Sequence, residues 1–282
     1  MPQSMKNRPL TRRFRTAIPI ACLLLLALPL TVYAQDHPEF DQYKLRIDGE
    51  WFYSNPSGTF EGQGENAPID FQKDLGFSSY STFGTEVDWK FTRKNHLIFK
   101  ASRFNSSDQI VLQRTIVFQG TTFDVGLQAQ GSLNAFLVSP GYQYDIIRRK
   151  RGHLGLGVQF NIFDTTAKIS AQAQVTGNGE QEAARSASAS LLAPIPVAGP
   201  QYRFYLTNSP RVFIEGDLYG MYFFGYGNYL STSDSLGVTL TKHISLKGGY
   251  MLASRLIVNG SSDRIGLHMT QQGGTAGLEF SF

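Results

Sequence analysis

The chain has 282 residues and one cysteine, and its 26 Lys and Arg against 22 Asp and Glu give a formal net charge of +4. Five of the basic residues and none of the acids lie in the first 34 residues, so the remainder holds 21 basic and 22 acidic residues, a net charge of −1. That balance removes the electrostatic support for nucleic-acid binding. The cysteine, Cys22, belongs to the same segment, so the rest of the chain can form neither a disulfide nor a thiolate metal site.

The N-terminal segment predicts a cleavable signal peptide. A basic stretch (6–15) precedes an uncharged, leucine-rich stretch (17–30), which is shorter than the roughly 18–20 residues of a membrane-spanning helix. Residues 31–34 then place a small residue at the −1 position and an aliphatic one at −3, a pattern that signal peptidase accepts. We therefore expect cleavage between Ala34 and Gln35, export by general secretion, and one domain over residues 35–282.

Beyond the signal, polar and apolar side chains alternate with a period of two. In residues 43–53 the even positions include Lys44, Arg46, Asp48 and Glu50, whereas the odd positions are mostly aromatic or aliphatic. Alternation of this kind indicates strands that are half buried. It recurs at 83–91, 154–162, 211–222 and 244–252, and no stretch of helix length has a period of 3.6.

The turns predict how these strands are connected. Short polar connections alternate with longer ones rich in Gly, Ser, Asn and Gln, which is the asymmetry between the periplasmic turns and the outer loops of a transmembrane β-barrel. The short ones are 92–95, 148–152, 207–210 and 241–243, and the long ones are 55–78, 171–190 and 254–272. Residues 95–147 predict one tall hairpin that turns near 119–121, and 224–229 predict a fourth outer turn.

We therefore predict an all-β, antiparallel, up-and-down transmembrane barrel. The segments give about ten strands, with eight or twelve as alternatives and both ends on the periplasmic side. A closed barrel satisfies every backbone polar group inside hydrocarbon, where an open sheet cannot. Three prolines (Pro194, Pro196 and Pro200) interrupt the sixth strand and predict a bulge there, because proline cannot donate to the hydrogen-bond ladder.

The last strand carries a recognisable pattern. Leu278, Phe280 and the terminal Phe282 share one face, while Glu279 and Ser281 share the other. The pattern resembles the C-terminal assembly signal of single-chain outer-membrane proteins, and the chain as a whole resembles the small OmpA/OmpW-like barrels. The resemblance implies a bacterial outer-membrane location and contact with the barrel-assembly machinery during biogenesis.

Charged residues of both signs fall on the inward faces of the predicted strands. Because a charge buried alone is costly, we expect salt bridges that fill a narrow lumen. A thin polar channel and a carboxylate cluster that binds cations remain alternatives. The residues concerned are Lys44, Arg46, Asp48, Glu50, Glu86, Asp88, Lys90, Lys100, Glu215, Asp217, Lys247 and Glu279.

Catalytic constellations are weak in this sequence. His96, His153 and His243 lie at predicted periplasmic turns, so only His268 with Ser261, Ser262 and Asp263 could form an outer-leaflet His–Ser–acid site. A protease would need grouped acids at the outer rim, where Asp108, Asp124 and Asp234 are the candidates. No metal-ligand spacing or cofactor motif is present. The run Arg148–Arg151 predicts a solvated turn or a contact with anionic lipid headgroups or a periplasmic partner.

The predicted function is thus an integral outer-membrane barrel with a structural or surface-interaction role. Its partners would be membrane lipid and lipopolysaccharide, the assembly machinery, and an extracellular ligand bound by the outer loops. A narrow passive channel is the first alternative, and a lipid-modifying enzyme or protease is the second.

Overall fold

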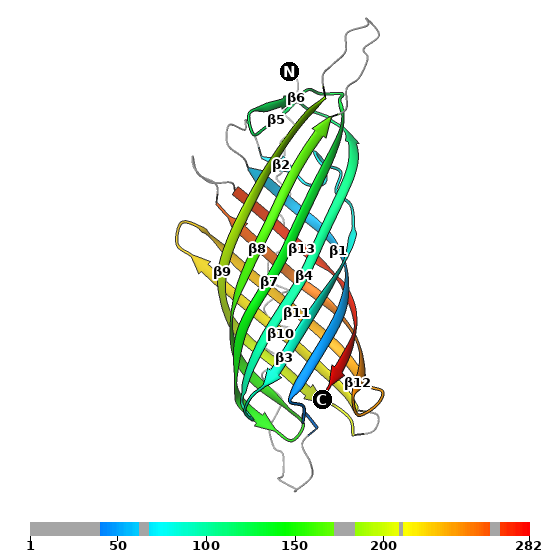
Figure 1. The fold of residues 1–282 in the computed structure, drawn as a ribbon, viewed down its shortest axis with the longest axis vertical. Helices are drawn as coiled ribbons and strands as arrows, with labels where there is room; N and C mark the ends of the chain where they lie inside the picture. The colour runs from blue at the N-terminus through cyan, green and yellow to red at the C-terminus, as the bar shows by residue number, and fades with distance from the viewer. Residues whose placement is uncertain (1–39, 62–67, 172–183, 209–210, 260–265) are drawn as a thin grey trace, which may run out of the picture. The chain divides into compact units, whose positions relative to one another are not determined.

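The computed structural model describes residues 40–61, 68–171, 184–208, 211–259 and 266–282. They form a closed antiparallel barrel of ten strands, as the sequence predicts, shown in Figure 1. Consecutive wall strands are neighbours, and the last pairs with the first from Arg46↔Ser281 to Glu61↔Gly266. The wall strands are β1 (Leu45–Glu61), β3 (Tyr80–Lys90), β4 (Asn95–Val111), β7 (Gln128–Arg149), β8 (Gly152–Ala171), β9 (Arg185–Tyr205), β10 (Arg211–Phe223), β11 (Gly227–Thr239), β12 (Ile244–Val258) and β13 (Gly266–Ser281).

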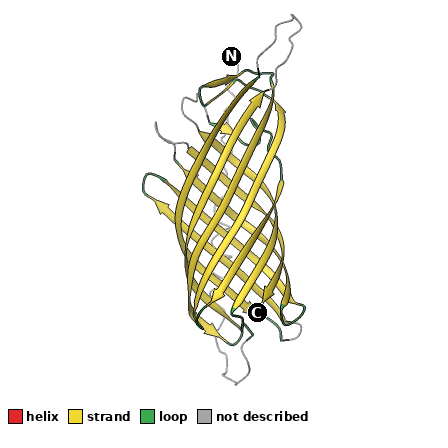
Figure 2. Ribbon diagram, in the orientation of Figure 1, coloured by secondary structure: helices red, strands yellow, loops and turns green. Residues whose placement is uncertain are grey.

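Figure 2 shows strands and loops in the part of the chain that the structure describes. Three short strands supplement the wall: β2 (Ile69–Asp70), which pairs with β1, and the hairpin of β5 (Ile116–Phe118) and β6 (Thr121–Phe123). Among the described residues, no helix is long and apolar enough to cross a membrane.

The predicted tall hairpin is confirmed. β4 and β7 pair without a break from Asn95↔Tyr144 to Val111↔Gln128. Between them, β5 and β6 are joined at Gln119 and Gly120, where both residues have positive φ, 50° and 71°. A glycine accepts this backbone conformation without a steric cost, which explains the turn at this point.

The barrel wall is higher on one side than on the other. β7, β8 and β9 have 22, 20 and 21 residues, whereas β10 and β11 have 13 each (Figure 1). The short turns lie at the end where the Lys44 backbone N–H donates to the Phe282 carbonyl, and we call this the periplasmic end. The long strands therefore rise above their neighbours at the opposite, extracellular end.

Polarity inverts along the long strands. In the lower part of β8 the outer face is apolar and exposed, with Val158 and Phe160, while Gln159 and Asn161 point inward. Higher up, Lys168 is outside and Ile169 is buried inside. The outer apolar section of β8 spans about nine residues, the length with which a tilted strand crosses hydrocarbon. The pattern is that of a strand that crosses a membrane in its lower half and stands in water above it.

Because of this inversion, the extracellular end contains an apolar core. The chain after β2 turns inward and buries Phe71 and Phe77, which pack with residues of the tall strands and of the β5–β6 hairpin. Asp74 fastens this segment, since its carboxylate accepts hydrogen bonds from Arg114 at 2.6 and 3.0 Å. The most deeply buried members of the core are Ile69, Phe71, Phe77, Leu112, Phe118, Phe123, Leu133, Ile169, Leu256 and Leu267.

The predicted bulge in the sixth strand is wrong. β9 pairs with β8 without a register shift through Pro194, Pro196 and Pro200. All three lie at alternate positions, so their missing N–H groups share one side of the strand. The last pair between β9 and β10 is Gly220↔Ala198, and β9 continues past it. Pro194 and Pro196 therefore stand on a stretch of β9 beyond its pairing with β10, where proline is tolerated.

Register irregularities in the described sheet lie elsewhere. They occur between Asp145 and Ile147 on β7 and at residues 252–253 on β12, where the pairing shifts by one residue relative to both β11 and β13. The irregularity on β12 lies beside the low side of the wall, and a bulge of this kind increases the local twist.

Candidate functional site: the barrel lumen

A network of ion pairs fills the periplasmic half of the lumen, and we call it the lumen network. Its side chains come from the segment before β1 and from most wall strands, and each contacts at least one residue of opposite charge. The members are Asp41, Arg46, Asp48, Glu86, Asp88, Lys90, His96, Lys100, Asp145, His153, Arg203, Glu215, Asp217, Lys247 and Glu279.

Arg203 is the most deeply buried Lys or Arg side chain of the network, at 2% exposure. Its two terminal nitrogens contact both oxygens of Glu279, at 2.5 and 2.7 Å, and one of them also donates to Glu215 at 2.7 Å. The guanidinium lies 3.8 Å from the ring centre of Phe213. Bidentate pairing and stacking on a ring are the contacts that arginine makes and lysine cannot reproduce.

Two further cations connect β1 to the opposite side of the lumen. The Lys247 ammonium lies 2.6 Å from Asp48 and 2.7 Å from Glu215. Arg46, on β1, contacts Glu86 on the neighbouring β3 at 2.9 Å and Glu215 on β10 at 3.4 Å. Each buried carboxylate therefore has a cation beside it, the condition under which such burial is tolerated.

Three of these carboxylates could be mistaken for a metal site. Asp48, Glu215 and Glu279 offer oxygen atoms that lie within 4.8 Å of one another. Protein cations already neutralise these carboxylates. Lys247 contacts Asp48 and Glu215, and Arg203 contacts Glu215 and Glu279. The donor set fits these cations, so we assign no metal to it.

Two histidines lie at the periplasmic edge of the network. His96 is fully buried between Asp88, at 2.9 Å from Nδ1, and Asp145, at 3.2 Å from Nε2. His153 Nδ1 lies 2.7 Å from Asp41, which also accepts a hydrogen bond from the Lys90 ammonium at 2.8 Å. The sequence predicts both rings at periplasmic turns, and the structure places them at that end of the barrel but buried inside it.

The segment before β1 folds inward to complete this edge. Burial by itself raises the pKa of Asp41, but the charges of Lys90, His153 and Arg203 outweigh it and hold that pKa well below the usual range. Tyr43 donates to Asp88 at 2.6 Å, and burial raises the pKa of this phenol well above its ordinary value.

Of the twelve residues predicted to point inward, Lys44 does not. Its side chain is exposed, and Tyr43 is buried in its place. The alternation fails there because residue 44 precedes β1, whose regular pleat begins at Leu45. The other eleven line the lumen, ten of them in ion pairs, and Glu50 is the eleventh.

The network also contains residues that the sequence did not single out. Arg203 was missed because the prolines obscured the sixth strand, although Gln201 and Arg203 alternate there with outward Tyr202 and Phe204. Asp41 lies before the first strand, so no alternating pattern could predict that its side chain points into the lumen. Asp145 could have been found, because it alternates with Gln143 on β7.

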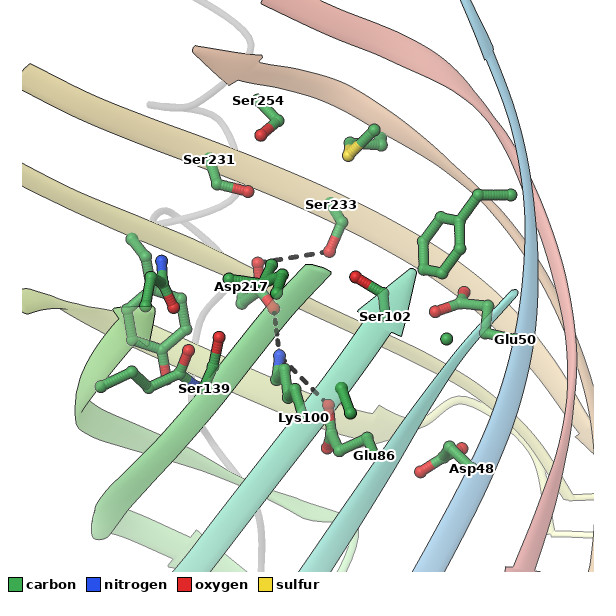
Figure 3. A pocket seen from close by; sticks show the side chains of 18 of the residues that line it. Asp48, Glu50, Glu86, Lys100, Ser102, Ser139, Asp217, Ser231, Ser233 and Ser254 are labelled. Atoms are coloured by element: carbon green, nitrogen blue, oxygen red, sulfur yellow. Dashed lines mark hydrogen bonds and ion pairs between the residues drawn. The ribbon is translucent and has the colours of Figure 1, made fainter. Parts of the chain in front are cut away.

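A cavity of about 270 Å³ lies between the lumen network and the extracellular apolar core (Figure 3). Lys100 bridges its lower wall, contacting Glu86 at 3.1 Å and Asp217 at 3.2 Å, and Ser233 donates to Asp217 at 3.2 Å. Glu50 also faces it. Its apolar lining consists largely of Phe52, Tyr80, Phe104, Leu137, Phe163, Tyr229, Met251 and Leu256.

The candidate catalytic residues are not brought together. His268 lies in β13 opposite Thr59, while Ser261, Ser262 and Asp263 fall outside the described residues. Among the outer-rim acids, Asp124 pairs with Arg185 at 3.4 Å, Asp234 accepts a hydrogen bond from Tyr202 on the outer face of the barrel, and Asp108 is on β4.

The remaining predicted positions lie at the chain ends and the turns. Leu278, Phe280 and Phe282 all point outward from the periplasmic half of the barrel. Arg148 contacts Asp145 at 3.6 Å, and Arg151 donates to Asn208 at 3.1 Å. The expected cleavage site, Ala34 and Gln35, lies outside the described residues.

Comparison with known proteins supports the fold of this chain but assigns it no specific role. No protein-family model matches the chain, and no curated protein does. Among solved structures, the outer membrane protease OmpT of Escherichia coli is 12% identical, with a TM-score of 0.51, covering 86% of this chain and 100% of its own. The chain has the fold of small outer-membrane β-barrels.

Two other outer-membrane barrels are matched at lower TM-scores. Ail, the attachment invasion locus protein of Yersinia pestis, is 10% identical, with a TM-score of 0.31, and 83% of this chain and 97% of Ail are covered. Neisserial surface protein A is 9% identical, with a TM-score of 0.33, and the coverage is 85% and 97%.

Proposed function

We propose that this protein is an integral, non-conducting barrel of the bacterial outer membrane whose folded extracellular end interacts with molecules outside the cell. The observation that carries the proposal is the lumen network. Its central groups come from opposite walls and are buried, so a solute moving toward the periplasm would have to separate Arg203 from Glu279 and Glu215. Separating a buried ion pair is costly, which favours a closed lumen over an open pore.

The extracellular end supports the second half of the proposal. Its outer surface is polar and its interior is apolar, so it is organised like a water-soluble domain on top of a membrane anchor. The tall β4–β7 hairpin and its β5–β6 tip supply much of that surface. Such a body keeps its shape outside the membrane and is suited to binding a partner there.

The barrel exterior fits lipid contact and assembly. Aromatic residues gather at the periplasmic rim of the outer face, among them Trp89, Phe91, Tyr142 and Tyr144, and another group with Tyr222, Phe224 and Tyr226 lies at the β10–β11 turn. Two such girdles mark the interfaces of an outer-membrane barrel. In this proposal lipid and lipopolysaccharide contact the band between them, and the assembly machinery recognises Leu278, Phe280 and Phe282.

Recording from planar bilayers tests the closed lumen. The refolded protein should give no unitary conductance at high voltage, whereas Arg203→Ala combined with Arg46→Ala and Lys247→Ala should introduce openings. A shift in gel mobility between unheated and boiled samples checks that each variant is folded. Regular openings of the unmodified protein would contradict the proposal and favour the narrow channel.

A further inference from the structure

The cavity above the lumen network has an excess of negative charge. Six carboxylates line it, from Asp48, Glu50, Glu86, Asp88, Glu215 and Asp217, against four cations from Arg46, Lys100, Arg203 and Lys247. Five of the six carboxylates contact a Lys or Arg within the network. Glu50 has no ion pair in the described part of the chain, and Figure 3 shows its carboxylate beside the cavity, apart from the Lys100 bridge.

Two other polar groups at the cavity lack partners. The Tyr219 hydroxyl and the Gln159 side-chain nitrogen have no hydrogen-bond partner within the described structure, although these residues are only 3% and 4% exposed. Both residues line the cavity. Buried polar groups in folded proteins are almost always hydrogen-bonded, so two orphans at one cavity indicate a polar molecule between them.

The upper part of the same cavity is apolar and aromatic. Tyr80 and Phe104 pack with ring centres 3.9 Å apart, and Phe163 and Tyr229 with centres 6.0 Å apart. A cavity of about 150 Å³ holds a benzene ring. The 270 Å³ here suits a ring that carries a short polar chain.

We propose that the cavity binds a small aromatic amine that also carries a hydroxyl group. The ammonium pairs with Glu50, the one lining carboxylate without an ion pair. The ligand's hydroxyl accepts a hydrogen bond from the Gln159 side-chain nitrogen, and its ammonium donates one to the Tyr219 hydroxyl. Its ring packs among the aromatic side chains of the upper cavity. The faces of those rings also attract a cation. The charge excess selects against an anionic ligand of the same shape.

The ligand reaches the cavity from the extracellular side. The lumen network closes the periplasmic side, and the wall is lowest at β10 and β11. Ser231 and Ser233 of β11 line the cavity on the low side and are partly exposed, so the cavity communicates with solvent there.

Titration calorimetry of the refolded protein tests the proposal. The probe is tyramine, and 4-hydroxyphenylacetate, which has a carboxylate in place of the ammonium group, is the charge control. Tyramine should bind saturably with one site and the anion should not bind. Equal affinity for both probes, or no binding of tyramine, would overturn the proposal and leave water as the occupant of the cavity.

Variants then locate the site. Glu50→Gln should weaken tyramine binding about tenfold, as loss of one partly desolvated ion pair does, and Tyr219→Phe should weaken it by a few-fold. Glu61→Gln makes the same chemical change on the same strand, away from the cavity, and should leave binding unchanged. Unaltered affinity in Glu50→Gln would overturn the assignment. Even if a variant fails to fold, the comparison of tyramine with 4-hydroxyphenylacetate on the unmodified protein still tests whether the cavity binds the amine.

Discussion

Arg203 on β9 contacts both carboxylate oxygens of Glu279 on β13, at 2.5 and 2.7 Å, although these strands are not neighbours in the barrel. The residues are 76 positions apart in the chain. β9 belongs to the high side of the wall and β13 closes the barrel against β1, so the pair links two walls through the lumen. Stability of the barrel therefore depends on an interaction inside it as well as on the hydrogen bonds of its wall.

Arg203→Met should destabilise the barrel strongly, because it leaves Glu279 and Glu215 buried without their main cation. Removing one partner of a buried ion pair costs about 3–5 kcal/mol. Urea unfolding of the protein in lipid vesicles measures this loss.

The control is Arg185→Met, which removes an ion pair to Asp124 whose side chains are 37% and 50% exposed. An exposed pair contributes at most about 1 kcal/mol. Equal losses for the two variants would show that Arg203 contributes no more than an exposed arginine does.

Asp41 makes the stability depend on pH in the acid range. Its folded-state pKa is depressed, because the charges of Lys90, His153 and Arg203 outweigh the effect of burial. A carboxylate whose pKa is lower in the folded state than in the unfolded state stabilises the fold. This stabilisation is complete at pH values above the unfolded-state pKa of about 3.9, and it is lost as the pH falls toward the folded-state pKa. Asp41→Asn should therefore be less stable at neutral pH, and the difference from the unmodified protein should shrink below about pH 4.

Unfolding midpoints measured at several pH values check this expectation. Asp124→Asn serves as the control, since that carboxylate is half exposed at the extracellular end. A constant difference between Asp41→Asn and the unmodified protein across the acid range would contradict the assigned role of Asp41.

The alternating pattern predicted most of the lumen because alternation depends only on the pleat. Once the strands of Asp48, Glu86 and Lys247 were recognised, a period of two assigned their side chains to one face. The pattern could not predict which inward-facing residues form ion pairs with one another. Arg203 meets Glu279 only because the barrel closes with a particular tilt and register, which are properties of the whole sheet.

Residues outside the strands escaped prediction for a different reason. Asp41 and His96 lie at the periplasmic edge, where the local sequence looks like a solvated turn. Their burial follows from the way the segment before β1 folds back into the lumen, which no periodicity records. The polarity inversion of β8 was visible in the sequence, as Phe160 and Lys168 lie on the same face, but the predicted alternation covered only residues 154–162.

Gly237→Ala should destabilise the barrel by overpacking. A Cβ atom at this position would lie 2.1 Å from the ring of Phe213, which is fully buried beneath Arg203. Forcing an extra carbon into a packed interior costs about 1–3 kcal/mol. Gly274→Ala is the matched control, because nothing lies within 4 Å of the added atom. The same urea titration compares the two, and an unaffected Gly237→Ala variant would show that the Phe213 ring moves freely.

Phe282→Ala, which removes the ring and keeps the backbone hydrogen bonds to Lys44 and Leu45, should impair assembly in cells more than it impairs the folded barrel. Its ring is 61% exposed and stacks on His243 at a centre distance of 5.7 Å, so its packing contribution is small. The expected result is a lower yield of heat-modifiable protein in outer-membrane fractions, with nearly normal refolding of the purified chain. His243→Ala removes the stacking partner and should leave assembly unchanged. A parallel loss in both variants would instead point to local packing.

The membrane boundary on β8 can be mapped with single cysteines, because the only natural one, Cys22, lies in the expected signal peptide. Lys168→Cys should react with a membrane-impermeant maleimide on intact cells, since that position faces outward above the apolar band. Phe160→Cys should stay unlabelled, although the side chain it replaces is 56% exposed, because lipid covers it. Urea-unfolded protein should label at both positions and serves as the control for thiol reactivity. Labelling of Phe160→Cys on intact cells would place that band in water and refute the membrane topology proposed for the barrel.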